Sequence, residues 1–377
     1  MYIPQFQLGV LKKKLEKGKV IVIYGPRRVG KTTLLNHFLE GCSDYLFVSG
    51  EDIFVHDYLS SQSIEKLRDF VGNKQLLVID EAQKISNIGI NLKLLVDHFP
   101  SLSIIATGSS TFDLARKVGE PLTGRKKVLQ IFPLSQIEIG QLETPAQTKA
   151  NLEKRLIFGS YPEVVLLSSD SDKKEYLHEL VRDYLYRDIL EYEGIKKSKK
   201  IIELLQLIAL RIGKEVSYSE LATRLGLGKA TVEKYLDLLE QVFVLINIRG
   251  FSRNLRSEVT KSSRYYFCDL GIRNALINNF NFFSVRNDIG EVWENYLIME
   301  RLKKQHYHQI YANNYFWRTY DHKEIDWIWI EEIEGKLNGF EFKWNHRKVK
   351  APSLWNKTYP ESTFAVISQE NYLDFII

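Results

Sequence analysis

The segment formed by residues 25–32 constrains what this chain can fold into more than any other feature. It has the sequence Gly-Pro-Arg-Arg-Val-Gly-Lys-Thr, follows a short apolar run and leads into a helical run. A strand, a glycine-containing loop and a helix in this order form the Walker A phosphate-binding loop. The predicted nucleotide-binding residues are Gly25, Pro26, Arg27, Arg28, Val29, Gly30, Lys31, Thr32 and Thr33.

The chemistry of this loop follows from its residue types. Its glycines let backbone N–H groups curl around a phosphate, and the N-terminus of the following helix adds positive partial charge. Lys31 would neutralise the β- and γ-phosphate oxygens, and the Thr32 hydroxyl would be a ligand of Mg²⁺. The sequence therefore predicts ATP and Mg²⁺ as cofactors.

Short apolar runs alternate with longer helical stretches from residue 19 to about residue 133. This alternation is typical of a doubly wound α/β fold with a parallel sheet. The near-continuous Val, Ile and Leu content of the runs indicates strands that are buried on both faces. The predicted strands are residues 20–24, 44–48, 75–79, 102–107 and 128–131.

Two carboxylates follow the third of these runs. Leu76 to Ile79 are apolar, and Asp80 and Glu81 come directly after them, which is a Walker B pattern. Asp80 would hold Mg²⁺ through its water shell, and Glu81 would be the catalytic residue that orients and deprotonates the attacking water. Two acids after a strand are weak evidence alone, but they are strong evidence downstream of a Walker A loop.

The fourth run ends in small hydroxyl residues, where a sensor of the γ-phosphate would lie. Thr107 or Ser109 could bond the attacking water or the γ-phosphate, and the alternative is that Ser109 or Ser110 only caps a helix. Arg125 is the third predicted sensor residue. It could stabilise charge in its own subunit or in a neighbouring one, or it could be a plain surface arginine.

These motifs resemble those of the AAA-type ATPases of bacteria and archaea that carry a C-terminal domain of unknown function. Ser160 is a departure, because members of that family usually have a glycine there. The resemblance implies ATP binding and hydrolysis, but it supplies no substrate. The segments that carry it are residues 25–32, 76–82, 107–110, 124–135, 158–163 and 176–188.

A helix, a glycine turn and a second helix predict a winged helix-turn-helix within residues 196–269. Ser219 and Lys229 would open the two helices, and residues 242–248 and 264–267 would form the wing. Basic residues there could contact DNA phosphates, but acids on the second helix would repel them, so a domain that only packs against protein remains the alternative. The basic residues are Lys229, Lys234, Arg249, Arg253, Arg256, Lys261 and Arg264, and the acids are Glu233, Asp237 and Glu240.

Three separated pieces near the C-terminus predict a nuclease-like core. Glu294 lies on a helical run and Asp326 on a strand-like run, and Glu341 and Lys343 share one side of a further strand-like run. This order resembles the PD-(D/E)XK restriction-endonuclease-like core, which hydrolyses phosphodiesters with a divalent ion. The resemblance implies Asp326, Glu341 and Lys343 as catalytic residues, and Glu294, Asp326 and Glu341 as metal ligands. Alternatively, Glu341 and Lys343 only form an ion pair on a solvated face.

Length and composition limit the remaining classes. With 377 residues, 44% of them apolar, the chain can bury about two to three globular domains. The net charge of +5 permits a nucleic-acid partner without requiring one. Cys42 and Cys268 have no partner at metal-ligand spacing, which suits a reducing cytoplasm. Because no signal peptide or membrane-spanning run is recognisable, we expect a cytoplasmic protein that binds no membrane.

The sequence thus predicts an α/β chain in four parts. The leading hypothesis is a Mg²⁺-dependent ATPase that couples its nucleotide state to a DNA-binding or nuclease-like C-terminal region, and homo-oligomerisation is left open. The alternative is a nucleotide-gated sensor or scaffold whose C-terminal half binds protein. The parts are an AAA+-like P-loop NTPase domain (1–133), a helical segment (134–195) with loops at 141–148 and 168–172, a winged helix (196–269) and a restriction-endonuclease-like domain (270–377).

Overall fold

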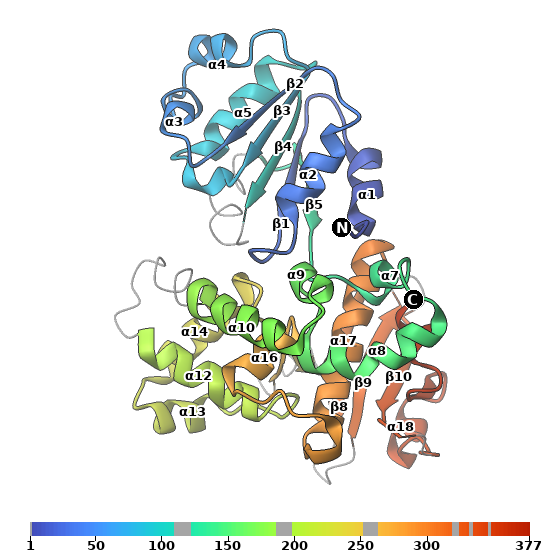
Figure 1. Cartoon of the computed structure of the whole chain (residues 1–377). Helices are drawn as coiled ribbons and strands as arrows, with labels where there is room; N and C mark the ends of the chain where they lie inside the picture. Colours follow the sequence, from blue (N-terminus) through green and yellow to red (C-terminus); the bar gives the residue numbers. More distant parts are fainter. Residues whose placement is uncertain are drawn as a thin grey trace. The chain divides into compact units, whose positions relative to one another are not determined.

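The chain forms two compact units in a computed structural model (Figure 1). The N-terminal unit contains residues 2–133 with 241–243, and the C-terminal unit contains residues 134–240 with 244–377. The structure describes residues 2–108, 122–185, 198–251, 263–318, 324–331, 335–345 and 348–377. Of the residues singled out in the sequence, Ser109, Ser110, Arg253, Arg256 and Lys261 lie outside these ranges.

The N-terminal unit contains the predicted parallel sheet. All pairings between its five strands are parallel, in the order β2-β3-β4-β1-β5. The strands are β1 (Val20–Tyr24), β2 (Tyr45–Ser49), β3 (Leu76–Asp80), β4 (Ser103–Gly108) and β5 (Lys126–Gln130), which confirms the predicted strands to within two residues. The helices are α1 (Phe6–Lys14), α2 (Lys31–Leu39), α3 (Ile53–Leu59), α4 (Ile64–Val71), the short η1 (Ala82–Lys84) and α5 (Ile88–His98).

The order of the strands decides where a site can form. Every residue of β1, β3 and β4 is buried, as expected for central strands that are covered on both faces. β4 lies between β1 and β3. Because the carboxyl ends of parallel strands meet at one edge of the sheet, this order brings the ends of all three strands beside the predicted phosphate loop.

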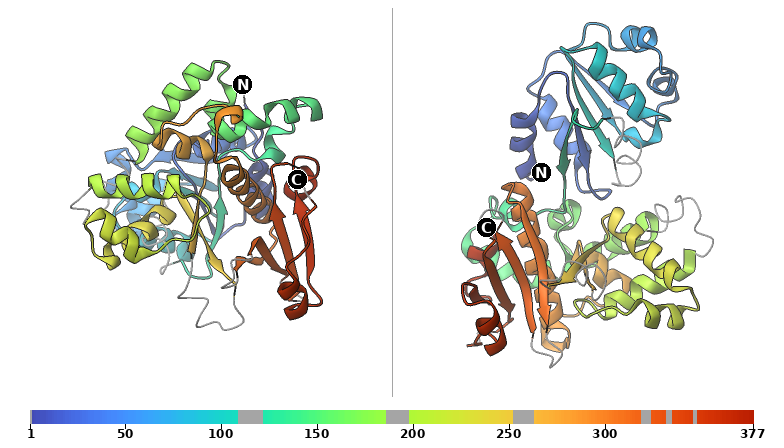
Figure 2. Two further views of the ribbon diagram at one scale, coloured as in Figure 1. Left: turned by 90° about the horizontal axis from the view of Figure 1, so that it is seen from below. Right: turned by 180° about the vertical axis from the view of Figure 1, so that it is seen from behind.

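The C-terminal unit is built on a six-stranded mixed sheet with the order β11-β10-β9-β8-β6-β7 (Figure 2). Its strands are β6 (Leu245–Gly250), β7 (Ser263–Phe267), β8 (Ala312–Arg318), β9 (Glu324–Glu331), β10 (Leu337–Phe342) and β11 (Thr363–Ile367). Its helices are α7 (Gln136–Ile139), α8 (Pro145–Phe158), α9 (Pro162–Leu166), α10 (Asp170–Leu180), η2 (Val181–Leu185), α12 (Ser198–Leu210), α13 (Tyr218–Leu225), α14 (Lys229–Gln241), α16 (Leu270–Leu276), η3 (Phe283–Val285), α17 (Ile289–Tyr307), α18 (Ser353–Thr358) and α19 (Tyr372–Ile376).

Two helices begin inside the segments that were predicted as loops. α8 starts at Pro145, because the Thr144 hydroxyl accepts a hydrogen bond from Gln147 N and the Gln147 side chain bonds back to Thr144 N. α10 starts at Asp170, where the Ser169 hydroxyl caps the first turn. Capping residues are polar, and they therefore resembled loop residues in the sequence. The loops predicted at 141–148 and 168–172 therefore end earlier in the structure than the sequence predicted, at the residues before α8 and α10.

α13, α14, β6 and β7 occupy the residues predicted for the helix-turn-helix and wing, although β6 begins three residues later than the predicted strand at 242–248. The two strands belong to a larger sheet. α13 and α14 are joined by the turn 226–228, and Ser217, not Ser219, caps α13. β6 and β7 form an antiparallel pair, and β6 also pairs with β8 in parallel. One sheet thus runs through residues predicted as two domains, and residues 134–377 are not divided into three compact units.

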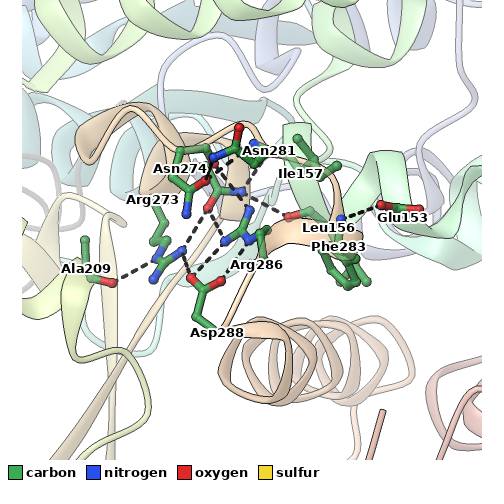
Figure 3. A network of polar contacts seen from close by, with 11 residues as sticks. Glu153, Leu156, Ile157, Ala209, Arg273, Asn274, Asn281, Phe283, Arg286 and Asp288 are labelled. Atoms are coloured by element: carbon green, nitrogen blue, oxygen red, sulfur yellow. Dashed lines mark hydrogen bonds and ion pairs between the residues drawn. The ribbon is translucent and has the colours of Figure 1, made fainter. Parts of the chain in front are cut away.

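A buried polar network holds helices from distant parts of the sequence together in this unit (Figure 3). Arg273 Nη1 lies 2.6 Å from Asp288 Oδ2, and Arg286 Nε lies 2.8 Å from Asp288 Oδ1. Arg273 Nε also donates to the carbonyl oxygen of Ala209 in α12, and Asn274 Nδ2 donates to carbonyl oxygens of α8. A paired and hydrogen-bonded cluster of this kind fixes α16 against α8, α12 and the start of α17.

Candidate functional site

The phosphate loop connects β1 to α2 at the carboxyl edge of the parallel sheet. Gly30 has a φ of +91°, a left-handed conformation that favours glycine, and α2 begins at the next residue. The Lys31 side chain is buried, and its ammonium donates to the carbonyl oxygens of Gly25 (2.9 Å) and Pro26 (2.8 Å). The lysine is therefore held against the loop whose backbone N–H groups would bind phosphate.

A chain of hydrogen bonds joins this loop to the ends of β3 and β4. Thr32 Oγ1 donates to Asp80 Oδ2 at 2.7 Å. Thr107 Oγ1 donates to the other carboxylate oxygen, Asp80 Oδ1, and accepts a hydrogen bond from Glu81 N at 3.1 Å. The structure thus brings together four residues that the sequence predicts for one site, and it gives Thr107 the task of fixing the Asp80 carboxylate.

Glu81 lies at the same edge in an unusual backbone conformation. Its φ is +50°, which is uncommon for a residue with a side chain and is concentrated at functional sites. Its Oε2 accepts a hydrogen bond from Gln83 Nε2, and Gln83 is buried in η1. The sequence analysis missed Gln83. The signal that could have found it is an amide two residues after the Walker B acids, where it can reach back to Glu81.

The donors at this edge suit Mg²⁺. Thr32 offers a hydroxyl oxygen and Asp80 a carboxylate, and the two groups are in hydrogen-bond contact. Mg²⁺ is usually held by one or two protein carboxylates together with waters and substrate phosphates, so a full set of protein ligands is not required. The residues present therefore fit an ion that is shared with a bound nucleotide.

Two glutamines near the N-terminus, which the sequence analysis missed, bond to the phosphate loop and to the neighbouring end of β5. Gln5 is buried, and its Nε2 donates to the carbonyl oxygen of Val29 in the phosphate loop at 2.9 Å. Gln7 is also buried, and its Nε2 donates to the carbonyl oxygen of Gln130 at the end of β5 at 3.0 Å. They contact backbone atoms, so no residue pattern identifies their partners.

Arg125 lies at the opposite edge of the sheet from this site. Its carbonyl oxygen accepts a hydrogen bond from Val20 N at the start of β1, whereas the phosphate loop follows the far end of β1. The two ends of a five-residue strand are about 13 Å apart. The exposed Arg125 guanidinium pairs with Asp97, with Nε 2.7 Å from Oδ1. The prediction that Arg125 serves the site of its own subunit is therefore wrong, and the neighbouring-subunit and surface interpretations remain.

The predicted nuclease-like residues lie close together in the C-terminal unit, but they bond to one another and to the backbone. Glu341 and Lys343 form an ion pair with Nζ 2.6 Å from Oε1, and Asp326 Oδ2 accepts a hydrogen bond from Phe342 N at 2.8 Å. Burial and the nearby Glu294 and Glu341 carboxylates raise the pKa of Asp326 well above its usual range. Burial alone would lower the pKa of Lys343, but the three carboxylates raise it.

Glu294 faces an arginine in place of a metal site. Its Oε1 accepts a hydrogen bond from the Tyr266 hydroxyl at 2.5 Å and lies 3.6 Å from Nη1 of the buried Arg264. Arg264 also pairs with Glu324 at 2.6 Å and lies over the Phe316 ring, 4.2 Å from its centroid. This arginine was predicted as a phosphate contact of the wing, and that prediction is wrong because its side chain is buried in an ion-pair network.

The three predicted metal ligands of this region are each contacted by groups of the protein itself. Within the described ranges, no group of three or more His, Cys, Asp or Glu side chains is arranged to hold a metal ion. The contacts explain why: Glu294 is directed to Tyr266 and Arg264, and Glu341 is directed to Lys343. The described structure therefore gives no support to a metal held by Glu294, Asp326 and Glu341, and that site stays a prediction. We call these three acids and Lys343 the carboxylate cluster.

The described cations of the helix-turn-helix are largely paired within the protein. Arg211 and Arg224 both lie against Glu220, at 2.7 and 3.4 Å, and Lys229 lies 3.7 Å from Glu233. Lys234 and Arg249 are exposed. Burial and the nearby Asp237 raise the pKa of Glu240 to about 7. The described part of this region therefore offers phosphate few unpaired charges.

Comparison with known proteins agrees with the geometry of the N-terminal unit. Residues 17–140 match the AAA domain family. The chain carries an AAA-type P-loop ATPase domain. This ATPase domain is followed by matches to two families of unknown function, DUF8612 over residues 149–282 and DUF4143 over residues 289–368. A Walker-type ATPase of Pyrococcus abyssi is similar in fold, with a TM-score of 0.50 and 15% identity over 72% of this chain and 93% of that one.

The relatives extend the likeness beyond the ATPase domain. An uncharacterized protein of Mycobacterium tuberculosis is 24% identical over 350 residues, which cover 91% of this chain and 74% of that protein. An uncharacterized protein of Methanocaldococcus jannaschii is 25% identical over 342 residues, which cover 84% of this chain and 73% of that protein. Among the helices that the structure describes, none has the length and apolar character needed to span a bilayer.

Proposed function

We propose that the ATPase domain hydrolyses ATP with Mg²⁺ and that Glu81 is the general base. The observation that carries this proposal is the hydrogen-bond chain from Thr32 through Asp80 to Thr107. It links the phosphate loop to both strand ends that would face a γ-phosphate. The contact of Gln83 with the Glu81 carboxylate supports the second part, because a base must be oriented to be effective.

Each residue of the proposed ATPase site then has a role in ATP binding or hydrolysis. The loop N–H groups bind the phosphates, and Lys31 exchanges its two carbonyl partners for β- and γ-phosphate oxygens. When bound, Mg²⁺ neutralises charge that develops on those oxygens. Thr32 and Asp80 are the residues that would hold it. Glu81 accepts the proton of the attacking water, and Gln83 keeps the Glu81 carboxylate turned toward that edge.

Phosphate release from ATP tests this proposal, measured with Mg²⁺ and with a chelator in its place. We expect turnover in the parent only with Mg²⁺, and no detectable Mg²⁺–ATP binding by calorimetry in Lys31→Ala. Lys74→Ala is the matched control, because Lys74 belongs to the same unit and forms an exposed pair with Asp44. Turnover at the parent rate in Lys31→Ala would contradict the assigned site.

We propose for the C-terminal unit the role of a nucleotide-gated binding module without nuclease activity. The support is that Lys343 of the carboxylate cluster pairs with Glu341, and that Arg264 lies against Glu294 of the cluster, so cations of the protein contact acids that a nuclease would use for metal. The competing proposal, a DNA-binding or nuclease-like region, draws its support from the order of the motif residues and from the helix-turn-helix.

Plasmid nicking separates these proposals. The parent protein should leave supercoiled plasmid intact with Mg²⁺ or Mn²⁺, with and without ATP. Nicking that disappears in Asp326→Asn would establish the nuclease. Binding of duplex DNA that weakens steeply with salt would support the DNA-binding proposal, because each neutralised phosphate adds to the salt dependence.

A further inference from the structure

Helix α3 lies in the N-terminal unit (Figure 1). Its first turn exposes two large apolar side chains. Ile53 is 81% exposed and Phe54 is 61% exposed. The Phe54 ring contacts Tyr58 with centroids 5.1 Å apart, and Tyr58 stacks on Phe70 of α4 at the same distance. We call these four residues the α3 apolar surface. Neighbouring apolar and aromatic side chains exposed to water are typical of protein-binding sites.

The sequence around the α3 apolar surface is strongly acidic. Between Lys31 and Lys66 there is no lysine or arginine, although the whole chain has a net charge of +5. Three acids of this stretch are exposed and lie beside Ile53 and Phe54 or one turn further along α3. They are Glu51, Asp52 and Asp57, and the other acids of the stretch are Glu40, Asp44 and Glu65. Asp44 is already paired with Lys74, and α4 carries the exposed Lys66 and Arg68, so the charge that favours a positively charged partner is that of Glu51, Asp52 and Asp57.

Hydrogen bonds hold the backbone around the α3 apolar surface in place. Asp52 Oδ1 accepts a hydrogen bond from a backbone N–H of the first turn at 2.9 Å, and a ring nitrogen of His56 lies 2.6 Å from the Gly50 carbonyl oxygen. Gly50 N donates to the Asp80 carbonyl oxygen at 2.7 Å, and a Cβ at Gly50 would collide with the Glu81 carbonyl. A surface that is already ordered loses little conformational entropy when it binds.

We propose that the α3 apolar surface docks a basic amphipathic helix of a partner protein. The apolar face of such a helix would cover Ile53 and Phe54, and its lysines and arginines would face the acidic residues around them. The same acids repel phosphate, which disfavours nucleic acid and anionic lipid as occupants. Gly50 links this surface to the end of β3, where Asp80 and Glu81 lie, because it is hydrogen-bonded to both His56 and Asp80. A role of that link in hydrolysis rests on the proposed ATPase function, whereas docking itself does not.

Fluorescence anisotropy with the full chain, in the absence of nucleotide, tests the docking. The probe is a labelled 18-residue synthetic helix with leucines on one face and lysines on the other. A matched probe keeps the leucines and carries glutamates in place of the lysines. The parent should bind the lysine probe more tightly than the glutamate probe by about tenfold or more, since both contact and charge favour it.

Three variants assign the binding to the surface. Ile53→Ser with Phe54→Ser should weaken binding of the lysine probe about tenfold or more, because exposed aromatic and apolar anchors carry most binding energy. Glu51→Lys with Asp57→Lys should reverse the preference between the probes. The control is Leu210→Ser with Val285→Ser, which removes apolar side chains that are 65% and 74% exposed in the C-terminal unit. This control should bind like the parent.

Each contrary result overturns the proposal in a recognisable way. Equal affinity for both probes, or equal losses in the control and in the Ile53/Phe54 variant, would mean nonspecific binding. Self-association in ultracentrifugation that disappears in the Ile53/Phe54 variant would identify a second copy as the occupant. Hydrogen-exchange protection of α3 in a monomer that binds no probe would mean that the chain covers this surface itself. None of these outcomes depends on ATP turnover.

Discussion

The residues of the proposed ATPase site, Lys31, Thr32, Asp80, Glu81 and Thr107, form what we call the catalytic edge. This edge and the carboxylate cluster of the C-terminal unit are made from similar groups. Each gathers acids and a lysine from separate elements. At the catalytic edge the lysine donates to backbone carbonyl oxygens, and the acids accept hydrogen bonds from uncharged groups. In the cluster, Lys343 pairs directly with Glu341, and Arg264 lies against Glu294.

This difference shows why motif residues in the right order do not establish an activity. A lysine that is bonded to carbonyl oxygens can exchange them for phosphate oxygens and leave no buried charge behind. A lysine paired with a buried carboxylate cannot leave without exposing that carboxylate to its acidic neighbours. The first arrangement is suited to a ligand, and the second is suited to holding the fold.

The sharpest test of the catalytic edge is Glu81→Gln. The amide can still orient water, but it cannot accept a proton, so we expect ATP turnover to fall by about 10² to 10⁴ while nucleotide affinity is retained. Steady-state phosphate release together with calorimetric titration of Mg²⁺–ATP measures both quantities. Unchanged turnover would assign the base to another residue.

Removal of the cluster's lysine tests the other side of the comparison. Lys343→Met leaves the Glu341 carboxylate, with a side chain 10% exposed, beside Asp326 and Glu294 without its cation. Because Lys343 is itself 35% exposed, we expect a moderate loss of about 1–3 kcal/mol in the free energy of unfolding, measured by urea denaturation.

The double variant Lys343→Met with Glu341→Gln should recover part of that loss, since it removes the unpaired charge. Unfolding in the presence of Mn²⁺ tests whether the carboxylate cluster binds a metal. A rise in the unfolding midpoint of the parent with Mn²⁺, absent in Glu341→Gln, would show that the cluster binds metal, and the contrast between the two regions would fail.

The pH dependence of stability gives a smaller effect with a definite sign. The pKa of Asp326 is raised in the folded protein, so the folded state holds this proton more tightly than the unfolded chain does. The protonated Asp326 carboxyl therefore contributes to the stability of the fold at low pH. This contribution is lost as pH rises above the ordinary carboxyl pKa of about 4. Asp326→Asn should therefore gain stability relative to the parent between pH 5 and pH 8.

Each unit of pKa shift corresponds to about 1.4 kcal/mol, which sets the scale of this gain. Urea denaturation of both proteins at the two pH values measures it. The neutral amide can still accept the hydrogen bond from Phe342 N, so the fold should be preserved. A stability difference that does not change with pH would mean that Asp326 is ionised in the folded protein.

Arg125→Ala should have the smallest effect. Arg125 lies at the far edge of the sheet in an exposed pair with Asp97, and such pairs contribute about 0–1 kcal/mol. Thermal unfolding should shift little, and ATP turnover of the monomer should stay at the parent value. A loss of turnover that appears only at protein concentrations where the chain self-associates would give Arg125 a role in a neighbouring site.

Much of the ATPase domain could be predicted from the sequence by itself. Its strands are continuous apolar runs, and the residues of the phosphate loop are consecutive, so local pattern determines both. Asp80, Glu81 and Thr107 follow strands directly, and parallel strands place their carboxyl ends at one edge. This reasoning failed for Arg125, because it precedes β5 and therefore lies at the other edge.

Only the tertiary structure decided which groups became partners. Gln5 and Gln7 bond to backbone oxygens, Gln83 reaches back to Glu81, and Arg264 lies against Glu294 across elements far apart in sequence. Spacing along one chain fixes which face of a strand or helix a residue shares. It does not fix which charged side chain from a distant part of the sequence lies beside that residue. The pKa of a buried acid depends on this neighbour. The sequence therefore determined which residues meet beside the phosphate loop, and packing decided that the carboxylate cluster pairs with cations of the protein itself.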